Sequence, residues 1–102
     1  MNIAQQILAA IYRAVDWVNG ELPPDRQLSK TPETRLLGPQ SVLDSLHLVG
    51  LLITIEREVQ DTIDVTLTLA DERALSMKES PFRTIESLAS YIKVLVSEAQ
   101  NG

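Results

Sequence analysis

The sequence predicts an all-α fold, a four-helix bundle with three main helices, one short third helix and a long loop between the first two helices. Aromatic residues make up only 4% of the 102 residues while apolar residues make up 44%, so the core must be built from Leu, Ile, Val and Ala. Apolar residues also recur at helical spacing in three separate segments. A chain of this length forms one domain, residues 1–102, with a single modest core, which argues against a self-contained enzyme.

The first helix is predicted over residues 2–18. Its apolar stripe is formed by Ile3, Ile7, Ile11, Val15 and Val18. Asn19-Gly20 is a natural end for this helix. We expect Trp17 to pack at the helix end with one edge near solvent, as tryptophan side chains usually do.

A long connecting loop is predicted over residues 20–43, because "GELPPDRQLSKTPETRLLGPQSVL" is rich in proline and has no sustained periodicity. A loop of this length is unusual in a small domain unless it packs against the core. We expect four leucines to anchor it: Leu28, Leu36, Leu37 and Leu43.

The second helix is predicted over residues 44–59, and its apolar residues spread over more than half of the circumference. The remaining polar strip consists of His47, Gly50, Thr54, Arg57 and Glu58. Such a helix must be covered on more than one side or must offer apolar surface to another molecule.

The last third of the chain contains three predicted elements. Ile63, Val65, Leu67 and Leu69 alternate with polar residues, and in a helical domain we interpret this as an extended segment that lays alternate side chains on the core. The capping-box pattern that begins at Thr68 predicts a short helix over 69–77. The final helix is predicted over 85–98, with Thr84 as N-cap and Glu86 in its first turn.

The formal net charge of −5 argues against a nucleic acid as partner, because phosphate binding depends on clustered Lys and Arg. A basic protein surface is the more natural complement.

The absence of cysteine excludes a thiolate nucleophile and a thiolate metal site. We find neither a signal peptide nor an apolar stretch that could span a bilayer, so we expect a cytoplasmic protein without membrane insertion. We also expect a monomer.

The segment Asp44-Ser45-Leu46-His47 places an acid, a hydroxyl and the only histidine within four positions. An acid–serine–histidine hydrolase site requires the imidazole within reach of the hydroxyl. Residues two apart on a helix point to nearly opposite sides, which excludes that triad for Ser45 and His47. A metal site needs several converging ligands, and the sequence offers a single histidine and no cysteine. We therefore predict no catalytic residue and no metal ligand. The simplest alternative is that Asp44 or Ser45 only caps the helix.

"LDSLHLV" followed by "IEREV" resembles the start of the second helix in the acyl carrier protein family. "GPQSVLDSL" is similar to that family's approach to the modified serine, and "SPFRTIESLASYI" is similar to the entry to its last helix. The resemblance extends over nearly the whole chain and implies a carrier that acts as a substrate of other enzymes, not an enzyme. It implies that Ser45 is the attachment point of 4′-phosphopantetheine, derived from coenzyme A, on which an acyl or aminoacyl group is held as a thioester.

The resemblance also implies the partners of such a carrier: a phosphopantetheinyl transferase, an acyl- or aminoacyl-loading ligase, and acyl-transferring or synthase enzymes. Carried over by position, the motif and recognition residues are Asp44, Leu46, Val49, Glu56 and Glu58. His47 and Gly50 stand where acids are common in fatty-acid carriers, and Arg57 interrupts the acidic run, so the chain is more similar to a specialised stand-alone carrier. The alternative function is a small helical interaction or regulatory protein with this fold and no prosthetic group.

Overall fold

The computed structural model describes residues 2–38, 41–69 and 81–101. These residues form three α-helices, α1 (Ile3–Asn19), α2 (Ser45–Ile63) and α4 (Ile85–Asn101), and a short 3₁₀ helix, η1 (Pro24–Arg26). The described residues contain no β-strand, only an isolated bridge between Arg35 and Thr84. The predicted all-α fold is therefore confirmed.

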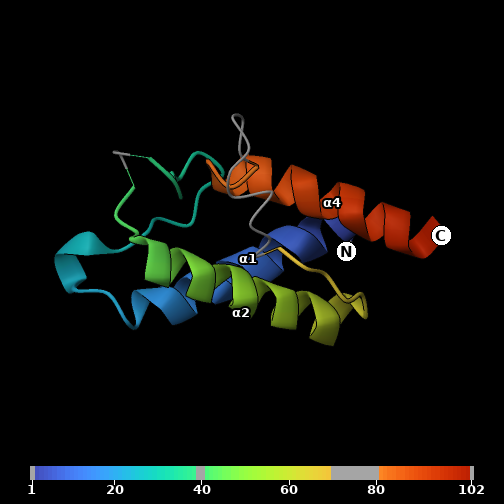
Figure 1. Ribbon diagram of the computed structural model, residues 1–102, viewed down its shortest axis with the longest axis horizontal. Coiled ribbons are helices and arrows are strands. Elements are labelled where there is room, and N and C mark those ends of the chain that lie inside the picture. Colours follow the sequence, from blue (N-terminus) through green and yellow to red (C-terminus); the bar gives the residue numbers. More distant parts are fainter. Residues whose placement is uncertain (1, 39–40, 70–80, 102) are drawn as a thin grey trace.

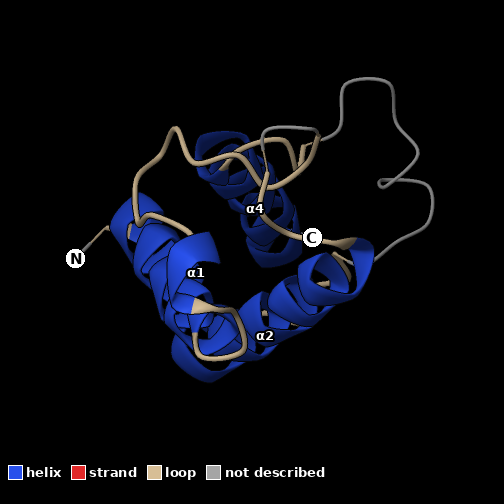
Figure 2. Cartoon of the chain, turned by 90° about the vertical axis from the view of Figure 1, so that its left-hand side faces the viewer, coloured by secondary structure: helices blue, strands red, loops and turns tan. Residues whose placement is uncertain are grey.

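Helix α1 is the helix against which the other two pack, and it lies closest along α2. Figure 2 shows the three helices arranged around a common interior. Helix α1 begins with a complete capping box, in which the Asn2 side chain accepts from the Gln5 N–H and the Gln5 side chain accepts from the Asn2 N–H. Asn2, which we had placed inside the helix, is thus its N-cap.

Helix α2 runs four residues beyond its predicted end at Val59. It stops at Asp64, which adopts a left-handed conformation with φ of 62°, and the Asp64 N–H donates to the carbonyls of Val59 and Gln60. Aspartate tolerates this conformation better than most residues, so it can serve the role that glycine usually has at a helix end. Helix α4 similarly extends to Asn101, past the predicted end at Glu98.

The long loop between α1 and α2 is packed against α4 by backbone hydrogen bonds, and Figure 1 shows it reaching the start of that helix. The N–H groups of Ile85 and Glu86 donate to the carbonyls of Thr34 and Pro32, at 3.1 and 2.8 Å. As predicted, Thr84 caps α4, since its Oγ1 accepts from the Ser87 N–H at 3.1 Å. The loop leucines Leu28 and Leu36 are buried, and Leu37 and Leu43 pack partly buried against the core.

The extended segment predicted from Ile63 onward follows α2 over residues 64–69, whereas Ile63 itself is the last residue of the helix (Figure 1). Val65, Leu67 and Leu69 are buried, whereas Thr66 and Thr68 are exposed. Alternate side chains therefore contribute to the core, and the ranges that the structure describes hold no partner strand for this segment. The short helix predicted over 69–77 lies, apart from Leu69, outside the described residues.

The core is aliphatic, as the composition predicts, with one buried aromatic ring. Phe82 is fully buried and meets Tyr91 edge to face, with ring centroids 6.1 Å apart. The largest fully buried aliphatic side chains come from all three helices, the long loop and the extended segment after α2: Ile7, Ile11, Leu36, Leu51, Leu52, Ile55, Leu69, Ile85, Leu88 and Ile92.

Candidate functional site at the start of α2

Ser45 is the first residue of α2 and is exposed to solvent. Within the described residues its side chain makes no hydrogen bond to another group. The next residue, Leu46, is also exposed, at 78%. The Ser45 hydroxyl is therefore accessible to a reagent that approaches from solvent.

Asp44 is the N-cap of α2. Its Oδ1 accepts from the His47 N–H at 2.8 Å, which satisfies one of the free donors of the first turn. The same oxygen lies 2.9 Å from Nδ1 of His47. His47, which the sequence places on the polar strip of the second helix, is thus paired with the motif acid.

The pKa of Asp44 is lowered from its ordinary value. The principal cause is the hydrogen bond from the His47 backbone N–H, and the His47 side chain adds a further hydrogen bond and charge in the same direction. Desolvation of the carboxyl, the second-largest influence, acts in the opposite sense and raises the pKa. Asp44 is consequently ionised at neutral pH and caps the start of α2 as a carboxylate.

The contact between Asp44 and His47 resembles the acid–histidine half of a hydrolase triad, but the other half is missing. Within the described residues no hydrogen bond joins Ser45 Oγ to His47. The imidazole nitrogen that approaches a polar group, Nδ1, faces Asp44. This arrangement positions His47 to support the helix cap, not to remove the proton of Ser45.

The two helix starts, of α2 and α4, differ in what satisfies their first N–H groups. At α4, the N–H groups of Ile85, Glu86 and Ser87 are bonded to Thr34, Pro32 and Thr84. At α2, the His47 N–H donates to Asp44 Oδ1 at 2.8 Å, and the Leu46 N–H interacts with the same carboxylate more weakly. The start of α2 is thus the more open of the two and presents the positive end of the helix dipole to solvent beside Ser45.

The two acids that the resemblance assigns to partner recognition are engaged within the protein. Glu56 Oε2 accepts from the N–H of Leu69, and this hydrogen bond links the extended segment 64–69 to α2. Glu58 Oε2 accepts from Nε of Arg13 at 2.8 Å and so joins α2 to α1. Neither contact is evident from sequence spacing, because the partners lie 13 and 45 residues away.

The exposed side of α2 next to Ser45 is largely apolar. Leu46 and Ile53 are 78% and 44% exposed, and their spacing of seven residues places them on one side of the helix. Gly50 lies between them, and the six-membered ring of Trp17 covers it, with Cη2 and Cζ3 each 3.4 Å from the position a glycine Cβ would take. Val49 is half-buried beside this surface. We call Leu46, Ile53, Arg57 and Trp17 over Gly50 the outer face of α2.

Sequence reasoning missed the role of Trp17 in this surface. It placed Trp17 at the end of the first helix with one edge in solvent, which agrees with its 48% exposure. The contact with Gly50 joins two residues from different helices, so no local pattern reveals it. A glycine within an apolar helix is the one signal in the sequence, since such a position often marks a close approach.

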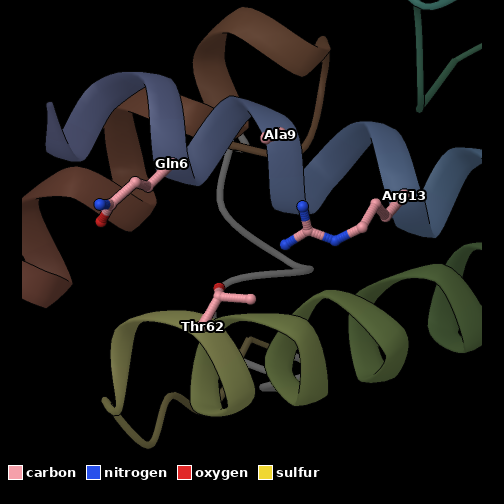
Figure 3. A pocket seen from close by; sticks show the side chains of 4 residues that line it. All are labelled: Gln6, Ala9, Arg13 and Thr62. Atoms are coloured by element: carbon pink, nitrogen blue, oxygen red, sulfur yellow. The ribbon is translucent and has the colours of Figure 1, made fainter. Parts of the chain in front are cut away.

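A shallow groove of about 210 Å³ lies between α1 and the far end of α2, lined by Gln6, Ala9, Arg13 and Thr62. Figure 3 shows Arg13 and Thr62 extending toward each other across it. Thr62 is about 25 Å along the helix axis from Ser45 at 1.5 Å per residue. The groove is therefore separate from the start of α2.

Comparison with protein-family models, with curated proteins and with solved structures gives no match. Among the described residues there is no group of three or more His, Asp or Glu side chains that could hold a metal ion. No helix within the described ranges is long and apolar enough to cross a bilayer.

Proposed function

We propose that this protein is a carrier of the acyl carrier protein type, in which Ser45 bears 4′-phosphopantetheine. The observation that carries the proposal is the position of Ser45, an exposed serine that begins α2 within the Asp44-Ser45-Leu46 motif and has no hydrogen-bond partner among the described residues. The all-α fold and the long loop packed against the last helix support it as well.

The local electrostatics fit a phosphodiester on this serine. The positive end of α2 favours an anion, and the start of the helix is open to solvent. The Asp44 carboxylate already accepts from the His47 N–H, so the phosphate would not depend on that donor. The exposure of Ser45 would leave the attachment point open to the enzyme that modifies it.

In the modification, the Ser45 hydroxyl oxygen bonds to the phosphorus of the phosphopantetheinyl group of coenzyme A. The pyrophosphate P–O bond breaks, 3′,5′-adenosine bisphosphate leaves, and the serine proton passes to a base on the transferase. When bound, the group supplies a terminal thiol on which an acyl or aminoacyl group is held as a thioester. The residues of this chain present the serine and contact the enzymes that act on it, in the cytoplasm.

The absence of cysteine makes the proposal testable by thiol chemistry. The unmodified protein should not react with a maleimide at neutral pH. After incubation with coenzyme A and a broad-specificity phosphopantetheinyl transferase, followed by removal of free coenzyme A, one reactive thiol per chain should appear. Ser45→Ala should remain unreactive.

A matched control is Ser41→Ala, which removes a neighbouring serine whose Oγ accepts from the Leu43 N–H. This variant should gain the thiol as the wild type does. A chain that gains no thiol, while a known carrier treated in parallel does, would instead favour a small helical interaction or regulatory protein without a prosthetic group.

A further inference from the structure

The segment that leads into α2, residues 41–43, is shaped mainly by local hydrogen bonds. The Ser41 N–H donates to the Gly38 carbonyl, and the Leu43 N–H donates to Ser41 Oγ, both at 3.0 Å. The side chains of Val42 and Leu43 pack partly buried against the core. The two local bonds join residues two or three positions apart, so they do not tie this backbone to a distant part of the chain.

Within the described ranges, Arg26 supplies the only hydrogen bond that makes such a tie to the backbone of 41–43. Its Nη2 donates to the Val42 carbonyl at 3.2 Å, across 16 residues of sequence. Figure 1 shows η1, which ends at Arg26, at the same end of the molecule as the start of α2. Val42 precedes Ser45 by three residues. The Arg26 guanidinium therefore holds the backbone just before the serine.

The backbone around Arg26 is itself restrained on both sides. Pro23 and Pro24 precede Arg26, and proline fixes φ. The Arg26 N–H donates to the Pro23 carbonyl at 3.0 Å. On the other side, the Asn19 side chain accepts from the Leu28 N–H at 2.8 Å and donates to the Leu28 carbonyl at 3.0 Å. A chain of contacts thus runs from the end of α1 through η1 to the backbone before α2.

This contact affects local order more than the stability of the whole fold. The Arg26 side chain is exposed, so water competes for its donors and the net gain in stability is small. A backbone with one restraint fewer samples more conformations. When a partner requires one of those conformations, its apparent affinity falls with the fraction of molecules that adopt it.

We propose that Arg26 is a positioning residue for the modification of Ser45. By holding the Val42 carbonyl, it keeps the approach to the serine in the conformation that the transferase binds. This inference rests on the proposed carrier function. Arg26 acts through the backbone and does not contact the reacting atoms, so its loss affects the binding of the carrier and not the chemical step.

The first test is phosphopantetheinyl transfer from coenzyme A by a broad-specificity transferase, with the carrier concentration varied. Arg26→Ala should raise KM for the carrier by about three- to tenfold and change kcat by less than about twofold, because the segment must then be ordered on binding. Arg26→Lys keeps a cationic donor on a shorter side chain and should recover part of the loss. Circular dichroism and Tm check that each variant is folded.

Arg35→Ala is the matched control, because it removes the same charge from the same loop. Arg35 is also exposed, and only its backbone takes part in the bridge to Thr84. Its side chain makes no hydrogen bond or ion pair with the residues that the structure describes. This variant should keep the wild-type KM.

The order of the approach segment is measured separately, by NMR order parameters of the Val42 and Leu43 amides. Rigid backbone gives values of about 0.85, and flexible backbone gives values below about 0.6. We expect these values to fall in Arg26→Ala and to stay at the wild-type level in Arg35→Ala. This measurement requires no transferase, so it tests the support given by Arg26 independently of the carrier function.

The two measurements together decide the inference. An unchanged KM in Arg26→Ala would overturn it. A raised KM with unchanged order parameters would overturn it as well, since Arg26 would then contact the transferase directly. An equal rise of KM in Arg35→Ala would assign the effect to the charge of the loop. Absence of any transfer to the wild type would refute the proposed carrier function, and the role of Arg26 in modification with it, even if the order parameters fall as expected.

Discussion

Glu58 on α2 accepts a hydrogen bond from Nε of Arg13 on α1 at 2.8 Å, and this ion pair links the two helices that pack most closely. Both side chains are partly exposed, at 44% for Arg13 and 29% for Glu58, so solvent weakens the attraction. The pair is therefore a modest stabilising contact, and it removes Glu58 from the free acids of the surface.

Reversing the charge of Glu58 tests this contact. Glu58→Lys should lower the free energy of unfolding by roughly 0.5–1 kcal/mol, because two cations then face each other. Adding Arg13→Glu should restore part of the loss. Urea unfolding of the two single variants and the double variant gives the coupling energy, and a coupling energy of zero would show that the pair does not form in solution.

Glu56 should matter more for stability, because it fastens the extended segment through the N–H of Leu69. Glu56→Ala should cost about 1–3 kcal/mol, the usual effect of leaving a partly buried donor without a charged partner. Glu56→Gln keeps an acceptor and should cost less. Amide hydrogen exchange at Leu69 should accelerate in Glu56→Ala, whereas unchanged exchange at that amide would contradict the contact.

Gly50 offers a stabilising substitution. Gly50→Ala should raise the free energy of unfolding by about 0.5–1 kcal/mol, because alanine favours the helix and its Cβ would make an ordinary contact with Trp17 at 3.4 Å. Gly50→Glu should instead displace the indole. The fluorescence of Trp17, the only tryptophan, then shifts to longer wavelength in Gly50→Glu but not in Gly50→Ala; identical spectra would place the ring elsewhere.

The cap of α2 should respond to acid. The pKa of Asp44 is lowered in the folded protein, mainly by the His47 backbone N–H. Its contribution is thus present above the ordinary aspartate pKa of about 3.9 and is lost as the pH falls through the lower folded value. Asp44→Ala should lower Tm at neutral pH and reduce the loss of Tm on acidification.

The matched variant for Asp44 is Asp44→Asn, since asparagine caps helices as well as aspartate does but does not titrate. It should keep a Tm near that of the wild type at pH 7 and lose the acid dependence that Asp44 causes. An unchanged acid dependence would assign that dependence to other carboxyls.

Local patterns in the sequence predicted the helices well because each signal involves neighbouring residues. The apolar stripe of α1, the Thr84 cap and the alternate burial of Val65, Leu67 and Leu69 all depend on spacings of a few residues, and the structure confirms them, although Ile63 belongs to α2. The end of α2 was predicted four residues early, because the left-handed cap at Asp64 follows Gln60, Asp61 and Thr62, which lack apolar periodicity.

The features of the candidate site that depend on distant contacts could not be predicted. The motif correctly predicted that Asp44 and Ser45 lie at the start of α2. By contrast, the engagement of Glu58 by Arg13 and the position of Trp17 over Gly50 arise from how α1 packs on α2. A family pattern transferred by position alone assigns Glu56 and Glu58 to the recognition of partner enzymes. It cannot reveal that Glu56 accepts from the Leu69 N–H and that Glu58 pairs with Arg13.

The central claim is that Ser45 receives a phosphopantetheinyl group, and intact mass tests it most directly. The protein is incubated with coenzyme A and a broad-specificity phosphopantetheinyl transferase, with Ser45→Ala alongside. We expect the wild type to gain the mass of one phosphopantetheinyl group, fragment spectra to place it on Ser45, and Ser45→Ala to gain nothing. An unmodified wild type in a reaction that modifies a known carrier, or an equal gain in Ser45→Ala, would contradict the account.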